Sequence, residues 1–222
     1  MFGHRVNEQT ELRLIDRPHI QELLQLLEAN REHLRPWHPW VDMMRSADVV
    51  GKAVAVWQQQ YANRRGCYYG IWFQGRICGM VSYNNIDPSN RWASLFYWLD
   101  AAHQGHGIMT ACCRTLVLDG FDRWKLNRIT IECATHNTRS RAIPERLGFK
   151  LEGIVRGIEW LHDRYVDHAM YGLLRGDPLR GDWMRVTEFP FAAPGAGPFA
   201  PDPAQSLCGP NRLAVEKAFS PA

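Results

Sequence analysis

The chain has 222 residues, of which 45% are hydrophobic and 11% aromatic, enough for the core of one ordinary globular domain. Its 26 basic and 23 acidic residues are spread along the chain and leave a net charge of only +3. Without blocks of Lys and Arg or a long apolar run, we expect neither a nucleic acid nor a membrane as partner. The N-terminus lacks the apolar segment of a signal peptide, which predicts a cytoplasmic protein.

The six cysteines form no CxxC pair, and most of them lie within apolar runs. Free cysteine in such a setting behaves as a small core residue, so this usage favours a reducing compartment. Nine histidines are also present, but their pairs lack the spacing that places two ligands on one helix face, and no cysteine joins them. We therefore expect no metal site.

The N-terminal part of the chain predicts one strand followed by two helices. Polar and apolar side chains alternate over residues 10–15, as in a half-buried strand. Asp16 then stands at the N-cap position of a helix whose apolar residues recur over residues 20–34. Ser46 opens a second helix of the same amphipathic kind. An aromatic loop that contains proline, residues 34–40, connects the two helices.

The middle and later parts of the chain predict a mixture of strands and helices. Three strand-like runs separated by tight turns suggest an antiparallel meander, and two helices, one of them ended by Gly148, alternate with further strands. The expected strands are 67–73, 76–84, 91–99, 128–134, 149–159 and 165–174, and the expected helices are 109–124 and 138–147. The order β-α-α-β-β-β-α-β-α-β-β predicts an α/β protein with a mixed sheet.

The composition changes beyond residue 175. Six prolines between residues 190 and 210 are interleaved with Gly and Ala, and no hydrophobic periodicity survives. We expect a domain over residues 1–175 and a largely disordered tail over residues 176–222. A short run at residues 212–219 has the pattern of one or two helical turns.

The stretch from Gln104 to Thr110 lies between a predicted strand and a predicted helix. A helix start offers unpaired N–H groups and the positive end of the helix dipole, both of which favour phosphate. Gly105 and Gly107 let the backbone approach such a group closely, and Gln104 and Thr110 add side-chain donors. Two glycines also suit a plain strand-to-helix turn, so the stretch alone leaves both interpretations open.

Together with the element order, this stretch resembles the first motif of the GNAT N-acetyltransferase superfamily, Gln/Arg-x-x-Gly-x-Gly/Ala. Gln104 and Gly107 match that pattern, whereas Met109 departs from its last position. The fuller run Gln-Gly-x-Gly-Ile-Met-Thr is similar to the version in the RimJ/RimL branch, which acetylates the N-termini of ribosomal proteins.

Further motifs in the same order resemble that branch. Residues 137–149 are similar to its Asn-x-x-Ser helix followed by Leu-Gly-Phe, and residues 165–172 to its last strand. The segment 38–42 resembles its loop between the first two helices. The resemblance covers about residues 5–175 and implies the GNAT acyl-CoA N-acyltransferase fold, with acetyl-CoA as co-substrate.

The resemblance also implies which residues bind acetyl-CoA. A backbone N–H in the range Trp98 to Asp100, at the splayed end of the fourth strand, is the expected oxyanion donor. Asn137 is expected to cap its helix, to bond the pantetheine amides, or both. His106 either contacts phosphate or faces water. The full set of expected acetyl-CoA residues is Trp98, Leu99, Gln104, Gly105, His106, Gly107, Ile108, Met109, Thr110 and Asn137.

For catalysis, the resemblance points to Glu159 as the base that takes the amine proton and to Ser140 as the acid that protonates the leaving thiolate. An apolar neighbour such as Trp160 is expected to favour the neutral form of Glu159 by desolvation. Pro144 lacks an N–H, which leaves the Ser140 carbonyl without its helix partner and bends the helix there.

The acceptor is the least determined part of the sequence-based account. Trp37 and Trp40 are expected either to wall the acceptor site or to pack as a plain lid. An α-amino group with a pKa near 7.7 to 8.0 is roughly 10% neutral at pH 7, whereas Lys is below about 0.1% neutral. A single modest base therefore suits an α-amine.

The leading hypothesis is acetyl transfer from acetyl-CoA to a protein or peptide N-terminal amine, such as that of a ribosomal protein. Small amines, among them antibiotics, amino-acid analogues and polyamines, satisfy the same chemistry. A module that binds acyl-CoA without turning it over is the alternative from another class. The resemblance also makes a homodimer an expectation.

Overall fold

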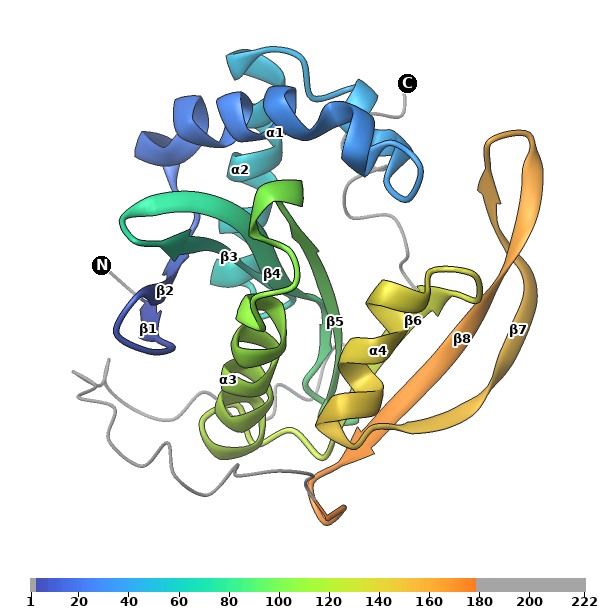
Figure 1. Cartoon of the computed structure of the whole chain (residues 1–222). Coiled ribbons are helices and arrows are strands. Elements are labelled where there is room, and N and C mark those ends of the chain that lie inside the picture. The colour runs from blue at the N-terminus through green and yellow to red at the C-terminus, as the bar shows by residue number, and fades with distance from the viewer. Residues whose placement is uncertain (1–2, 179–222) are drawn as a thin grey trace.

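A mixed sheet of eight strands forms the middle of the computed structural model, which describes residues 3–178 (Figure 1). The strand order is β1-β2-β3-β4-β5-β6-β8-β7, and every neighbouring pair is antiparallel except β5 and β6. The strands are β1 (Gly3–Arg5), β2 (Thr10–Leu14), β3 (Cys67–Phe73), β4 (Arg76–Asp87), β5 (Trp92–Leu99), β6 (Arg128–Ala134), β7 (Lys150–Leu161) and β8 (Arg164–Leu174). The helices are α1 (Ile20–Leu34), α2 (Ala47–Ala62), α3 (Ile108–Asp122) and α4 (Thr138–Leu147).

This architecture confirms the predicted class and element order. The short strand β1 was not predicted, because three residues give no readable alternation. Local signals set several boundaries as expected: the Ser46 side chain accepts a hydrogen bond from the Val49 N–H at the start of α2, and Gly148 ends α4 with φ of 85°. The loop predicted between α1 and α2 contains a 3₁₀ turn, Pro39–Asp42.

The two faces of the sheet carry separate hydrophobic cores. On one face α1 and α2 pack against side chains such as Trp72, Met80 and Trp98. On the other face α3 and α4 pack against residues such as Val81, Leu95 and Ile131. All five cysteines within the described residues are free and buried, as their apolar surroundings predicted.

The strands β5 and β6 diverge along their length. Their parallel pairing covers only Trp92–Leu95 of β5 against Arg128–Ile131 of β6. The remaining residues of β6 continue to pair with β8, and those of β5 with β4, so the sheet opens between two intact halves. This divergence leaves backbone polar groups on the inner edge of β5 without a strand partner.

The last two strands form a long hairpin that projects beyond the rest of the sheet (Figure 1). Its turn reaches the end of α1, where the His162 ring Nε2 lies 3.0 Å from the Arg35 carbonyl oxygen. Among residues 3–178, no helix is both long and apolar enough to cross a membrane. The predicted disordered tail, residues 176–222, and its helical run at 212–219 lie outside the described residues, apart from residues 176–178.

Candidate active site

A cleft of about 2290 Å³ opens where β5 and β6 diverge. Pockets for single drug-sized ligands are usually about 300–1,000 Å³, so this cleft has room for two substrates. It is lined by the α1–α2 connection, by β4 and β5, by the starts of α3 and α4, and by β7 and β8. Every residue that the sequence placed in the site lies along this cleft except His106, which is exposed outside it.

The start of α3 forms one end of the cleft. Gly105 and Gly107 have φ of 82° and 74°, a region in which side-chain-bearing residues are strained. Gly107 occupies the N-cap position without a side-chain cap, and the first helical bond is donated by Ala111 to the Gly107 carbonyl. A Cβ added at either glycine would meet no atom within 4 Å. The two glycines before the helix are exposed, so an anion can approach the helix start directly, as a phosphate cradle requires.

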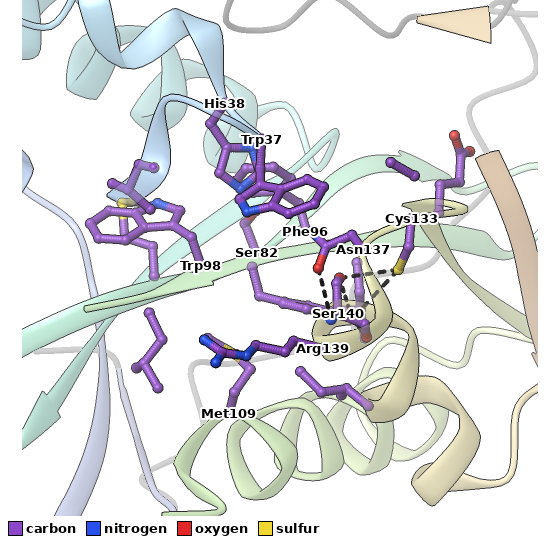
Figure 2. A pocket seen from close by; sticks show the side chains of 18 of the residues that line it. Trp37, His38, Ser82, Phe96, Trp98, Met109, Cys133, Asn137, Arg139 and Ser140 are labelled. Carbon is purple, nitrogen blue, oxygen red and sulfur yellow. Dashed lines mark hydrogen bonds between the residues drawn. The ribbon is translucent and has the colours of Figure 1, made fainter. Parts of the chain in front are cut away.

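Two arginines of α4, which the sequence reasoning missed, face this helix start. Arg139 donates a hydrogen bond of 2.8 Å to the Gln104 side-chain oxygen, and Arg146 donates one of 3.2 Å to the Thr110 hydroxyl. Figure 2 shows Arg139 extending from α4 toward Met109. Both side chains line the cleft and add positive charge to the anion-binding end. No sequence motif indicates these two arginines, because their partners lie more than thirty residues away in the sequence.

The direction of the backbone N–H groups along the inner edge of β5 limits which of the expected residues can act as the oxyanion donor. The Asp100 N–H donates to the Cys78 carbonyl of β4 at 2.7 Å. Because N–H groups alternate in direction along an antiparallel strand, the Leu99 N–H points away from β4, into the divergence. Of the three expected residues, Leu99 thus presents its N–H to the cleft, while the N–H groups of Trp98 and Asp100 point toward β4.

Ser140 lies in the first turn of α4, where Asn137 acts as the N-cap. The Asn137 side-chain oxygen accepts a hydrogen bond of 3.1 Å from the Ser140 N–H. The Ser140 hydroxyl lies 3.1 Å from the Cys133 sulfur at the end of β6 (Figure 2). The capping role expected for Asn137 is therefore present, and it fixes the Ser140 backbone at the rim of the cleft.

Tyr97 of β5 compensates for the missing N–H of Pro144. Its hydroxyl donates a hydrogen bond of 3.0 Å to the Ser140 carbonyl, the group that Pro144 leaves without a helix partner. The same hydroxyl accepts from the Ser140 Oγ at 3.3 Å. Burial raises the pKa of Tyr97 well above its usual value, so the phenol stays protonated and can keep donating.

Glu159 lies on β7 with its Oε2 atom 2.7 Å from the Nε2 atom of His168 on β8. The apolar neighbour expected from the sequence, Trp160, lines the same cleft but is 57% exposed and packs edge-on against Tyr165. The hydrogen-bond partner of the carboxylate is the imidazole of His168.

Aromatic residues of the α1–α2 connection form a further wall of the cleft. Trp37 lies 5.1 Å, centroid to centroid, from His136 of the β6–α4 loop, so it bridges the two halves of the sheet. Trp40 packs against His38. His38 also contacts Phe96 of β5 (Figure 2). Burial lowers the pKa of His38 to about 4, so this ring is neutral at pH 7.

Comparison with known proteins places this geometry among acetyltransferases. The family model described as an acetyltransferase (GNAT) domain matches residues 9–150. A putative ribosomal N-acetyltransferase of Bacillus subtilis, YdaF, is 36% identical over 176 residues, which are 79% of this chain and 96% of the relative. The ribosomal-protein-serine acetyltransferase of Escherichia coli is 31% identical over 171 residues, covering 75% of this chain and 93% of that protein.

A solved structure shares the whole architecture. RimL, described as a ribosomal L7/L12 α-N-protein acetyltransferase in complex with coenzyme A, superimposes with a TM-score of 0.76 at 31% identity. The match covers 78% of this chain and 98% of RimL.

Proposed function

Because the chain belongs to the GNAT acetyltransferase family, we propose that it transfers the acetyl group of acetyl-CoA to the α-amino group at the N-terminus of a protein or peptide. One observation carries this proposal. The uncapped start of α3, the hydroxyl of Ser140 and the carboxylate of Glu159 come from separate parts of the chain and line a single cleft.

In this proposal the chain contributes three groups to the reaction. The amine nitrogen attacks the thioester carbon, the new C–N bond forms and the C–S bond breaks. Glu159 takes the proton that the amine loses, and the Ser140 hydroxyl protonates the departing thiolate. The Leu99 N–H stabilises the negative charge that develops on the carbonyl oxygen.

The cofactor end of the cleft is assigned to the start of α3. A diphosphate suits the N–H groups at the helix start, which belong to Ile108, Met109 and Thr110. The left-handed backbone at Gly105 and Gly107 lets the chain approach it closely. Arg139 and Arg146 neutralise its charge. The remaining expected contacts, Gln104 and Asn137, line the same cleft. The exposed position of His106 favours contact with water.

The acceptor end is assigned to the cleft between the aromatic wall and the β7–β8 hairpin. Trp37 and Trp40 wall it on one side and Glu159 on the other. Relatives named for acetylating ribosomal proteins support a protein N-terminus as acceptor. An α-amine also suits a single carboxylate base, because roughly 10% of it is already neutral at pH 7.

We also infer that the catalytic unit comprises residues 1–175, since β8 ends at Leu174, and that it acts in the cytoplasm. The five cysteines within residues 3–178 are free and buried, which supports a reducing compartment. A homodimer stays a prediction.

A thiol-release assay tests the proposal. Purified protein is given acetyl-CoA with peptides that begin with Ser or Ala, or with an aminoglycoside, an amino-acid analogue or a polyamine. We expect thiol release with the peptides at a kcat/KM at least tenfold above that for any small amine. Turnover of a small amine with none of the peptides would move the function to small-molecule acetylation. Binding of acetyl-CoA without release from any acceptor would favour a non-catalytic module.

A further inference from the structure

The pairing of β7 with β8 contains a shift next to Glu159. Val155 pairs with His168, but the next pair is Glu159 with Val166, so three residues of β7 oppose a single residue of β8. With continuous register, Glu159 would pair with Arg164 instead. At about 3.3 Å per residue, the bulge moves Glu159 along β8 by roughly 7 Å toward His168.

Asp167 fixes this bulge. Gly157, in the middle of the extra residues, has φ of 58°, and its N–H donates a hydrogen bond of 2.8 Å to the Asp167 Oδ1 atom. The Asp167 carbonyl in turn accepts from the Thr135 N–H at 2.9 Å. The bulge is therefore tied to β8 and, through it, to the loop that leads into α4.

His168 contacts the Glu159 carboxylate in the position that the bulge gives it. Its Nε2 atom lies 2.7 Å from the Glu159 Oε2 atom, and its Nδ1 atom is buried without a hydrogen-bond partner in the described part of the chain. A buried N–H without an acceptor is rare in folded proteins, so the ring proton belongs on Nε2. The imidazole thus donates to Glu159 and favours the ionised, proton-accepting form of the carboxylate.

We propose that the consecutive residues Asp167 and His168 are positioning residues of the catalytic base: Asp167 fixes the bulge that brings Glu159 into the cleft, and His168 orients its carboxylate. This inference rests on the proposed role of Glu159 in acetyl transfer. Neither residue touches the reacting atoms in this account, because both act through Glu159.

A second imidazole faces Glu159 from the α1–α2 connection. His38 interacts with the charge of Glu159, yet its pKa is about 4 because burial outweighs that attraction. His38 therefore stays neutral above pH 5 and does not obscure an acid limb that belongs to Glu159.

Steady-state kinetics of His168 variants test the first half of the proposal. We expect His168→Leu to lower kcat at least tenfold with the KM for acetyl-CoA within twofold of wild type. The acid limb of its pH–rate profile should move up by about one pH unit, because the ionised carboxylate loses a hydrogen bond. His168→Gln keeps an N–H donor and should restore the wild-type position of that limb. A wild-type kcat and profile in His168→Leu would overturn the role of His168.

Asp167 variants test the second half. Asp167→Ala removes the acceptor for the Gly157 N–H and should lower kcat about tenfold, whereas Asp167→Asn keeps a carbonyl acceptor and should recover most of the loss. Asp163→Asn, in the exposed turn of the same hairpin, is the matched control and should leave kcat unchanged. Equal kcat in Asp167→Ala and wild type would overturn the role of Asp167.

A readout without an acceptor separates this inference from the proposed function. In protein labelled with ¹³C at the Glu side-chain carboxyl, the Glu159 signal is the one that Glu159→Gln removes. We expect its titration midpoint to rise by about one pH unit in His168→Leu and not in His168→Gln. An upward shift of the midpoint in a protein that acetylates no peptide would contradict the proposed function and leave this inference standing. An unchanged midpoint in a protein that acetylates peptides would contradict this inference and leave the proposed function standing.

Discussion

At the scale of single residues, Tyr97 and Pro144 form a compensating pair. Pro144 removes a helix hydrogen bond one turn after Ser140, and the Tyr97 hydroxyl replaces it from β5. This arrangement ties the start of α4 to the diverging edge of the sheet. The position of the Ser140 hydroxyl in the cleft then depends on a contact that α4 does not make by itself.

A double-mutant cycle tests this coupling. Tyr97→Phe should destabilise the protein by about 1–3 kcal/mol, because the partly buried Ser140 carbonyl loses its donor. In a Pro144→Ala background the helix supplies an N–H again, so the same change should cost about 1 kcal/mol less. Urea unfolding of the four proteins measures the coupling. Equal costs in both backgrounds would show that Tyr97 does not replace the missing Pro144 bond.

The sequence identified part of the site at this scale. Ser140 and Glu159 were predicted because they lie in motifs of a known family, and the vacant Ser140 carbonyl followed from the chemistry of proline. Tyr97 lies in none of these motifs, and His168 lies in the stretch that resembles the last strand, which does not indicate that it contacts Glu159. Their partners are set by how strands pair, and the bulge in β7 makes the neighbour of Glu159 unreadable from residue spacing.

At the scale of elements, the left-handed glycine at the start of α3 belongs to the proposed cofactor end of the cleft. Gly107 has φ of 74°, and Gly75, in the turn between β3 and β4, has φ of 81°. An added Cβ meets no atom within 4 Å at either position. The two glycines are thus matched in backbone strain and in open space, and only Gly107 lines the cleft.

Alanine substitutions of these two glycines should therefore separate strain from binding. We expect Gly107→Ala and Gly75→Ala each to lower the free energy of unfolding by about 1–2 kcal/mol. The KM for acetyl-CoA should rise about tenfold only in Gly107→Ala, because its Cβ enters the phosphate site. Calorimetry and steady-state kinetics measure both quantities. A KM increase of the same size in Gly75→Ala would contradict a special role for the helix start.

Most elements were predictable because they depend on local patterns. The caps at Ser46 and Gly148 and the periodicity of α1 to α4 are readable within a few residues. Asp16 was predicted to cap α1 but caps the 3₁₀ turn Arg17–His19 before it, and α1 begins after His19 without a side-chain cap. The divergence of β5 from β6 is not, since the sequence of each strand continues without a break. Its presence came only from the family resemblance, and its extent came from the pairing in the structure.

At the scale of the whole molecule, a buried polar cluster away from the cleft makes stability depend on pH. His4 is 4% exposed, and burial, followed by the charge of Arg123, lowers its pKa to about 4. The unfolded chain binds this proton near pH 6.5, so stability is lost as the pH falls from 6.5 to 4. Asp119, whose pKa burial raises to about 6, is stabilising on protonation over nearly the same range and offsets part of this loss.

Measurement of the free energy of unfolding at different pH values tests whether His4 makes stability depend on pH. We expect the free energy of unfolding to fall between pH 6.5 and 4, with His4 contributing up to about 1.4 kcal/mol per pH unit. His4→Gln should reduce that slope, whereas His106→Gln, at an exposed position, should not. Denaturant unfolding at several pH values provides the measurement. An unchanged slope in His4→Gln would place the titrating group elsewhere.

The whole fold serves to hold two intact sheet halves apart around one cleft. Trp37 and His136 meet across it, and His162 joins the hairpin turn to the end of α1. These contacts leave the start of α3 at one end and Glu159 toward the other. Donor and acceptor can thus approach from different sides, as direct transfer between two substrates requires.

The site of acetylation on a peptide tests the central claim most directly. A peptide that begins with Ser and also contains one Lys is incubated with acetyl-CoA and the protein, and tandem mass spectrometry locates the acetyl group. We expect acetylation of the α-amine alone, at a rate that falls at least a hundredfold in Glu159→Gln, as for loss of a general base (~10²–10⁴-fold). Acetylation of the Lys side chain alone, or an equal rate in Glu159→Gln, would contradict the central claim.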